Sequence, residues 1–323
     1  KGDEMAKGLD WLATDSAPKD YPAYVVDAIF ALEDGSVEGV PDDRLSNAGW
    51  GEPGSVQIIG DDEKAAPRQL NVKWYDLVSR KGYAGAFPLQ ADRMDSVLRQ
   101  RFPQPDGNRT AADYLRVGFA PGGDVAVWVS SQRVNHLVGM FKAAPAQIEL
   151  SEMSHDPALS LDQFVHRMLD AALPDGKAQQ IVAAPVPEGL WHHLDKRYTW
   201  QVSVIGQFTG DLLWVEYANG EADWFDLSGK REPRTSSMTE VRAIPELLEF
   251  GWSGPTGRKF QARVEFDQAE VMAAFERFAA ESPGQPIVIE AEPQDQGREV
   301  GVYLRSGQKF YRFTKVRSGV WDG

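Results

Sequence analysis

The chain has 323 residues, with 48 acidic and 34 basic side chains, a formal net charge of −14 and no cysteine. This length favours about two domains, and acidity spread over both halves argues against nucleic acid as a partner, which requires a basic surface. The lack of cysteine excludes disulfides, thiolate metal sites and cysteine nucleophiles. No apolar run approaches the ~20 residues that span a bilayer.

The first half is expected to consist mainly of strands. Residues 24–32 are followed by Asp34-Gly35, which predicts a strand and then a turn. Residues 44–63 are mostly polar and are expected to form a long surface loop. From residue 70 to residue 131 the pattern predicts strand, polar turn, strand, helix, strand, tight turn and strand. The apolar face of that helix is formed by Met94, Val97, Leu98 and Phe102.

The clearest helix covers residues 160–173. Ser160 followed by Gln163 is the pattern of a capping box. The stripe expected to be buried consists of Leu161, Phe164, Met168 and Leu169. Asp267 with Glu270 gives the same start signal to a helix in the second half.

The best linker candidate is the segment 183–189, which reads Ala-Ala-Pro-Val-Pro-Glu-Gly. We therefore place a domain boundary inside it. Residues 1–186 are predicted to form a first α+β module with an added helix near 160–173. Residues 187–323 are predicted to form a second, related α+β module.

The second half repeats the order of elements predicted for residues 70–131. Trp74 and Trp252 each lie on a strand that leads to a turn containing Arg-Lys, and Val-Trp-Val-Ser-Ser is matched by Val-Tyr-Leu-Arg-Ser. In this repeat, the strand predicted at 24–32 corresponds to residues 200–208. A twofold repeat of this length predicts two similar globular modules from an internal duplication. The fold class is then α+β, each module having a mostly antiparallel sheet with one main helix packed on it.

No motif for a reaction survives inspection. Gly251-Trp252-Ser253-Gly254 is one residue away from the nucleophile elbow of hydrolases, and Pro121-Gly122-Gly123-Asp124 is better explained as a hairpin turn. The five histidines show no spacing typical of metal ligands. We therefore predict no catalytic, cofactor-binding or metal-binding residue, no cofactor, and a protein that is not an enzyme.

Tryptophans and acids outside the repeated strands are the candidates for partner binding. Aromatic side chains in loops are typical anchors of protein interfaces, with peripheral packing as the alternative. The acidic run of residues 61–63 is expected to be a solvated loop. Trp74 and Trp252, in contrast, are expected in the core. The predicted partner-binding residues are Trp50, Asp61, Asp62, Trp191, Trp214 and Trp224.

Several stretches together resemble a bacterial family of predicted lipoproteins. They are Tyr21-Pro22-Ala23, Gly49-Trp50-Gly51, Leu70-Asn71-Val72-Lys73-Trp74 and the segment from Gly118 to Val129. The family is a domain of unknown function found beside type VI secretion lipase genes. The resemblance covers the first half, and the second half resembles a degenerate copy without the Pro-Gly-Gly turn. The layout of two modules also resembles the periplasmic immunity protein of a type VI phospholipase effector.

This resemblance implies a non-enzymatic inhibitor in the periplasm. Its partner would be a cognate phospholipase or lipase effector, whose active-site lid or entrance the two modules would hold. The family's lipid-bearing cysteine is absent from this sequence, so a membrane anchor is expected only in a longer form of the chain.

Two other functions stay open. The chain is alternatively an envelope lipoprotein with a carbohydrate-binding, small-ligand-binding or enzymatic site between its modules, since domain interfaces are favoured positions for pockets. A third hypothesis is a structural envelope lipoprotein with no inhibitory role.

Overall fold

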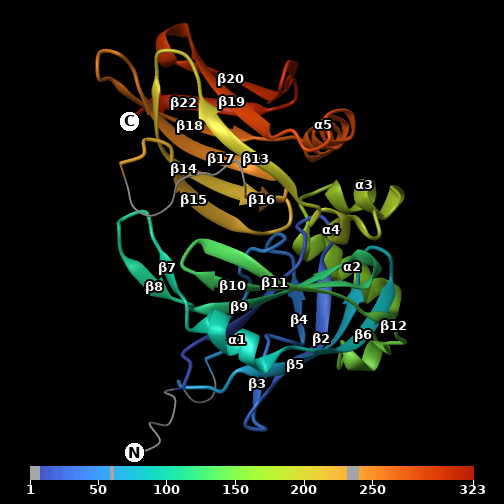
Figure 1. The fold of residues 1–323 in the computed structure, drawn as a ribbon. Helices are drawn as coiled ribbons and strands as arrows, with labels where there is room; N and C mark the ends of the chain where they lie inside the picture. Colours follow the sequence, from blue (N-terminus) through green and yellow to red (C-terminus); the bar gives the residue numbers. More distant parts are fainter. Residues whose placement is uncertain (1–7, 59–61, 231–239) are drawn as a thin grey trace, which may run out of the picture. The chain divides into compact units, whose positions relative to one another are not determined.

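The computed structural model describes residues 8–58, 62–230 and 240–323. The fold is mixed α+β and consists mostly of strands, which confirms the predicted α+β class (Figure 1). The prediction of one sheet in each module was wrong, because each unit contains strands of two sheets. The chain divides into two compact units: unit 1 lies within Lys1–Phe102 and Thr110–His192, and unit 2 within Pro103–Arg109 and His193–Gly323. The sequence placed the boundary between residues 186 and 187 and gave no sign that 103–109 belong with the second unit. None of the helices in the described ranges is long and apolar enough to cross a membrane.

Unit 1 contains two sheets. In the first, the strands run in the order β1-β9-β10-β11, with β1 parallel to β9 and the other pairs antiparallel. Their bounds are β1 Leu12–Ser16, β9 Tyr114–Ala120, β10 Asp124–Ser131 and β11 Val134–Lys142. The 3-10 turn Pro121–Gly123 (η1) joins β9 to β10, with φ of +81° at Gly122 and +88° at Gly123. These angles favour glycine, so the predicted Pro-Gly-Gly turn is confirmed.

The second sheet of unit 1 is antiparallel and follows the order β12-β6-β5-β2-β3, with β4 also paired to β2. Its strands are β2 Ala23–Leu32, β3 Val37–Gly39, β4 Arg44–Ser46, β5 Pro67–Asp76, β6 Lys81–Pro88 and β12 Ala144–Pro145. Leu70, Val72 and Trp74 alternate along β5 and are buried. The Trp74 ring lies 5.3 Å from that of Phe119 on β9, so the two sheets pack face to face.

Helix α1 (Ala91–Leu98) follows β6 and buries Met94 and Leu98. Phe102, predicted on the same helix, instead belongs to β7 (Arg101–Pro103), which pairs with β8 (Arg109–Ala111). The helix ends earlier than its apolar period suggested, and Phe102 is buried from a strand.

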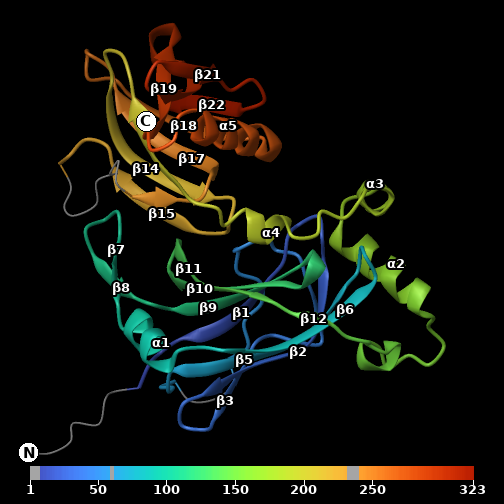
Figure 2. The same cartoon turned by 45° about the vertical axis from the view of Figure 1, so that its right-hand side comes forward.

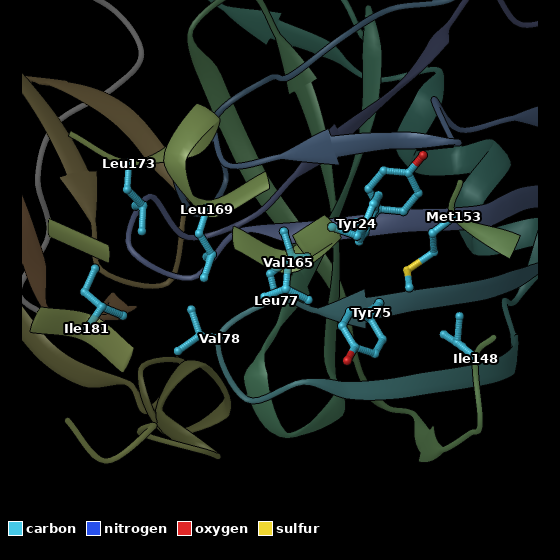
Figure 3. Packing of buried hydrophobic residues seen from close by; sticks show 11 residues of the cluster. Tyr24, Tyr75, Leu77, Val78, Ile148, Met153, Val165, Leu169, Leu173 and Ile181 are labelled. Atoms are coloured by element: carbon cyan, nitrogen blue, oxygen red, sulfur yellow. The ribbon is translucent and has the colours of Figure 1, made fainter. Parts of the chain in front are cut away.

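Helices α2 (Leu161–Ala172) and α3 (Lys177–Ala183) pack on the other face of the second sheet (Figure 3). The predicted capping box at Ser160 is confirmed in both directions. The ring of Phe164 meets that of Tyr24 edge-on at 5.3 Å. Leu161, expected to be buried, is 37% exposed. The cluster that these helices complete is formed by Tyr24, Tyr75, Leu77, Val78, Ile148, Met153, Phe164, Val165, Leu169, Leu173 and Ile181. The 3-10 turn η2 (Leu150–Glu152) and helix α4 (Leu190–His193) are short.

Unit 2 also contains two sheets (Figure 2). One has the order β15-β14-β17-β18-β22, with all pairs antiparallel. Its strands are β14 Thr209–Tyr217, β15 Ala222–Asp226, β17 Pro245–Ser253, β18 Lys259–Glu265 and β22 Arg317–Asp322. The other has the order β16-β13-β19-β20-β21, with β13 parallel to β19. Its strands are β13 Tyr198–Val204, β16 Val241–Arg242, β19 Ile287–Gln294, β20 Glu299–Ser306 and β21 Lys309–Arg312.

Helix α5 (Gln268–Glu281) packs Phe275 against the rings of Tyr198 and Trp200. Asp267 caps it by accepting from the Glu270 N–H at 2.9 Å. The Glu270 carboxylate does not accept from the backbone N–H of Asp267, so the capping box is incomplete. It accepts instead from the Thr314 hydroxyl at 2.7 Å, so this helix start is tied to the chain after β21.

The same order of pairings recurs in the two units. In each, a strand pairs in parallel with the strand that follows a helix, β1 with β9 after α1 and β13 with β19 after α5. Trp200 lies on β13, which takes the position of β1. The predicted correspondence of residues 200–208 with residues 24–32 was therefore wrong, because β14 takes the position of β2 in the strand order. Descent from one duplicated unit remains a prediction.

Candidate functional site

The structure brings together two of the predicted partner-binding residues, Trp50 and Trp191, in unit 1. The Trp50 ring lies 4.9 Å from that of Trp128 on β10 and 6.3 Å from that of Trp191 on α4, whose ring also meets Tyr21 at 5.3 Å. We call these four residues the aromatic cluster. Trp50 is half-buried, whereas Trp128 and Trp191 are buried. Trp50 and Tyr21 are the members of the cluster that keep an exposed surface, which a partner could contact without rearrangement.

The segment 47–56, which carries Trp50, is a loop as the sequence predicted, but it is bonded to strand β1. The Ser16 hydroxyl donates to the Gly49 carbonyl at 2.7 Å, and the Thr14 hydroxyl donates to the Ser55 carbonyl at 2.7 Å. The Asp15 carboxylate accepts from the Ser55 N–H at 2.8 Å. This segment is therefore held along β1 by side chains that its own sequence does not contain.

Arg116 on β9 provides a further attachment for this segment. One guanidinium nitrogen donates to the Gly51 carbonyl at 2.7 Å, and another donates to the Gln132 carbonyl at 3.3 Å. Arg116 is only 6% exposed, and burial lowers the pKa of its guanidinium. A buried cation bonded to backbone carbonyls here has a structural role.

The remaining predicted residues have different surroundings. Trp214 and Trp224 face each other across β14 and β15 in unit 2 and are buried. The expectation that they lie in or beside loops was wrong, because both belong to strands. The indole N–H of Trp224 donates to the Pro103 carbonyl at 2.8 Å, and the indole N–H of Trp214 donates to the Glu216 carboxylate at 3.2 Å. Asp62 is exposed. Asp61 lies outside the described residues.

A surface on β20 and β21 of unit 2 was not predicted from the sequence. Residues 305–317 contain five basic side chains and no acidic one, in a chain whose net charge is −14. Aromatic residues alternate with the cations. We call Tyr303, Arg305, Phe310 and Arg312 the basic aromatic surface. A signal was present in Lys-Phe-Tyr-Arg-Phe-Thr-Lys-Val-Arg, but charges summed over half a chain conceal it.

Strand register places these four side chains on one face. Tyr303 is opposite Arg312, and Arg305 is opposite Phe310. The Tyr303 and Phe310 rings stack at 5.5 Å with 26° between their planes. The guanidinium of Arg305 lies 5.5 Å from the Phe310 ring, and that of Arg312 lies 5.7 Å from the Tyr303 ring. Leu304, on the opposite face, is fully buried, whereas Phe310 is 56% exposed.

The charges of this region are only partly compensated. Arg305 pairs with Glu290 at 2.7 Å, and the hydrogen bond that its guanidinium donates to the Glu290 carboxylate raises the pKa of Arg305. Lys309 pairs with Glu281 at 2.7 Å. Among the residues that the structure describes, Arg312 and Lys315 form no ion pair. Two exposed cations of this region, one of them beside the Tyr303 ring, thus have no carboxylate of their own among the described residues.

Other polar groups of the described chain form no comparable site. No group of three histidine, aspartate or glutamate side chains in these ranges could hold a metal ion. His193 bonds Glu276 at 2.7 Å on the surface. An open hollow of about 640 Å³ runs along α2, where Asp162 and His166 are well exposed. Such exposed side chains are solvated, and ion pairs between them contribute little free energy.

Comparison with known proteins gives a family and no activity. A family described as "Protein of unknown function (DUF2931)" matches residues 2–189. No curated protein and no solved structure matches the chain.

Proposed function

The chain belongs to the DUF2931 family of proteins of unknown function, and from this premise we propose a protein-binding role. The protein is an immunity protein that binds and inhibits a cognate type VI secretion phospholipase or lipase effector in the periplasm. It is not an enzyme. It acts by holding the lid or the entrance of the effector's active site.

The observation that carries this proposal is the basic aromatic surface. Tyrosine, phenylalanine and arginine are enriched at protein interfaces, where a few of them supply most of the binding energy. Phe310 is 56% exposed and stacked on Tyr303, so its ring is already ordered before a partner arrives. An ordered anchor loses less side-chain entropy on binding.

A second argument comes from the recurrence of the strand order. We infer that the two units descend from one ancestral unit that was duplicated, because β1-β9-β10-β11 and β13-β19-β20-β21 have the same sequence of parallel and antiparallel pairs. Two linked binding units can contact one partner at two points, which raises the effective concentration of the second contact. The resemblance to an immunity protein with two modules is consistent with this arrangement.

The test uses the lipase encoded beside the gene for this protein. The two purified proteins are mixed at equal concentration, the complex is sized by light scattering, and hydrolysis of phospholipid vesicles is measured. We expect a stoichiometric complex and loss of hydrolysis. A lipase effector from an unrelated gene pair is the matched control and should stay active. Full activity of the neighbouring lipase at a large excess of this protein would refute the proposal.

The proposed location is the periplasm, with a lipid anchor in the full-length product. Fractionation of cells that express the complete gene tests this directly. The product should be released with periplasmic contents or recovered with membranes. Recovery in the cytoplasmic fraction would contradict it.

A further inference from the structure

β21 is an edge strand whose backbone remains available for pairing. It is the last strand of its sheet within the described ranges, with β20 as its neighbour. The turn to β20 has two residues, Gly307 and Gln308, with φ of +60° at Gly307. Such a turn is flanked by a hydrogen-bonded pair, here Ser306 with Lys309.

This register decides which backbone groups point outward. Hydrogen-bonded and non-hydrogen-bonded pairs alternate along an antiparallel ladder. Lys309 and Tyr311 therefore bond to β20, and the Phe313 N–H continues the series by donating to the Val302 carbonyl at 3.0 Å. The N–H and C=O groups of Phe310 and Arg312 point to the free edge. The same two residues carry the exposed side chains of the basic aromatic surface.

Charge selects what can pair there. A second copy of this strand would bring Lys309 and Arg312 against cations of their own kind, and like charges directly opposite are destabilising. Cations on an edge strand are a known protection against such self-pairing. Arg312 and Lys315 have no carboxylate among the described residues. An acidic strand would satisfy both the backbone groups and these charges.

We infer that β21 is a docking edge for an extended acidic segment of a partner protein, which adds to the sheet as a further strand. Apolar side chains of that segment pack on Phe310 and Tyr303, and its carboxylates pair with Arg312 and Lys315. The effector is the partner if the proposed function holds. The inference about the edge depends only on the chemistry of the strand.

The test uses the full chain and a blocked octapeptide of alternating glutamate and valine. Binding is followed by calorimetry, and the bound amides by hydrogen exchange. We expect saturable binding, added protection of the Phe310 and Arg312 amides, and weaker affinity as salt rises from about 50 mM to about 300 mM, because exposed charges are screened. The matched lysine–valine peptide should not bind.

Three variants locate the contact. Phe310→Pro removes an outward N–H and should abolish binding, whereas Phe310→Ala keeps that N–H and should only weaken it. Arg312→Glu combined with Lys315→Glu should reduce affinity by ~10-fold or more through charge reversal. Circular dichroism checks that each variant is folded. If the proline variant is unfolded, the charge variant alone tests the docking edge.

The opposite outcomes are equally defined. Equal binding of both peptides, no binding of either, or unchanged amide exchange would overturn the inference. Binding to vesicles of anionic lipid in place of the acidic peptide would assign the edge to a membrane surface and overturn it too. If the peptide docks and the lipase is not inhibited, only the proposed function fails. If the lipase is inhibited equally by the wild-type protein and by the variants, only the docking edge fails.

Discussion

Substitution of Gly118 by alanine tests whether the aromatic cluster closes tightly on β9. A Cβ atom at this position would lie 2.6 Å from the Cη2 and Cζ3 atoms of Trp128 and 2.7 Å from Cζ3 of Trp50. These distances are shorter than any real carbon contact, so both rings must move. Gly118 is not among the residues with positive φ, and alanine therefore meets no backbone strain there.

The magnitude follows from two opposing effects. Overpacking a close-packed interior costs ~1–3 kcal/mol. Replacing glycine by alanine returns ~0.4–1 kcal/mol by restricting the unfolded chain. We expect a net loss of ~1–2 kcal/mol. For a domain of 150 to 250 residues this corresponds to a fall in Tm of ~2–8 °C.

Calorimetry gives the unfolding temperature, and near-ultraviolet circular dichroism reports on the packing of the tryptophans. Gly319→Ala is the matched control: this glycine also lies on a strand, β22, but a Cβ there would meet no atom within 4 Å. The control should change stability by ~0.5 kcal/mol at most. Trp50→Ala should partly rescue Gly118→Ala by removing one of the two rings. Equal stability of the Gly118 and Gly319 variants would refute the packing that we describe.

Three further predictions concern stability. Ser160→Ala removes the cap that accepts from the Gln163 N–H and should cost ~1 kcal/mol, measured by the urea midpoint; an unchanged midpoint would contradict the observed capping box. Burial raises the pKa of Asp76 in the folded state despite hydrogen bonds from its own turn, so its contribution to stability is present below the unfolded pKa and is lost as pH rises through the folded value. Asp76→Asn should therefore flatten the fall in stability between acid and neutral pH, and a steeper fall would contradict this sign. Lys64→Met leaves the buried Glu38, 3.8 Å away, without its cation and should cost ~3–5 kcal/mol, whereas the double variant with Glu38→Leu should recover most of that loss; a double variant as unstable as Lys64→Met would show that the pair is not coupled.

The aromatic cluster and the basic aromatic surface differ in what they can offer a partner. Trp128 and Trp191 are buried in the folded chain, so their rings stabilise the packing of segment 47–56. Phe310 is exposed on an edge strand, and its ring is held by Tyr303. Binding energy is expected mainly from the second location, because exposed and ordered aromatics are the ones that a partner can bury.

Local interactions made part of the fold predictable. Ser160 caps α2 with a residue three positions away, and Gly122 adopts its positive φ within one turn. The alternation of Leu70, Val72 and Trp74 on β5 depends only on the pleat of a strand. Each of these features depends on neighbours in the sequence, so composition and spacing were sufficient.

Tertiary structure alone decided the rest. The attachment of segment 47–56 to β1 was not predicted, because Thr14 and Ser16, which hold it, lie more than 30 residues away in the chain. Trp224 looked like a loop residue until the pairing of β15 with β14 placed it in a buried strand. The free edge of β21 likewise exists only through the strand order. Contacts between distant segments carry no local periodicity, so they appear only when the sheets form.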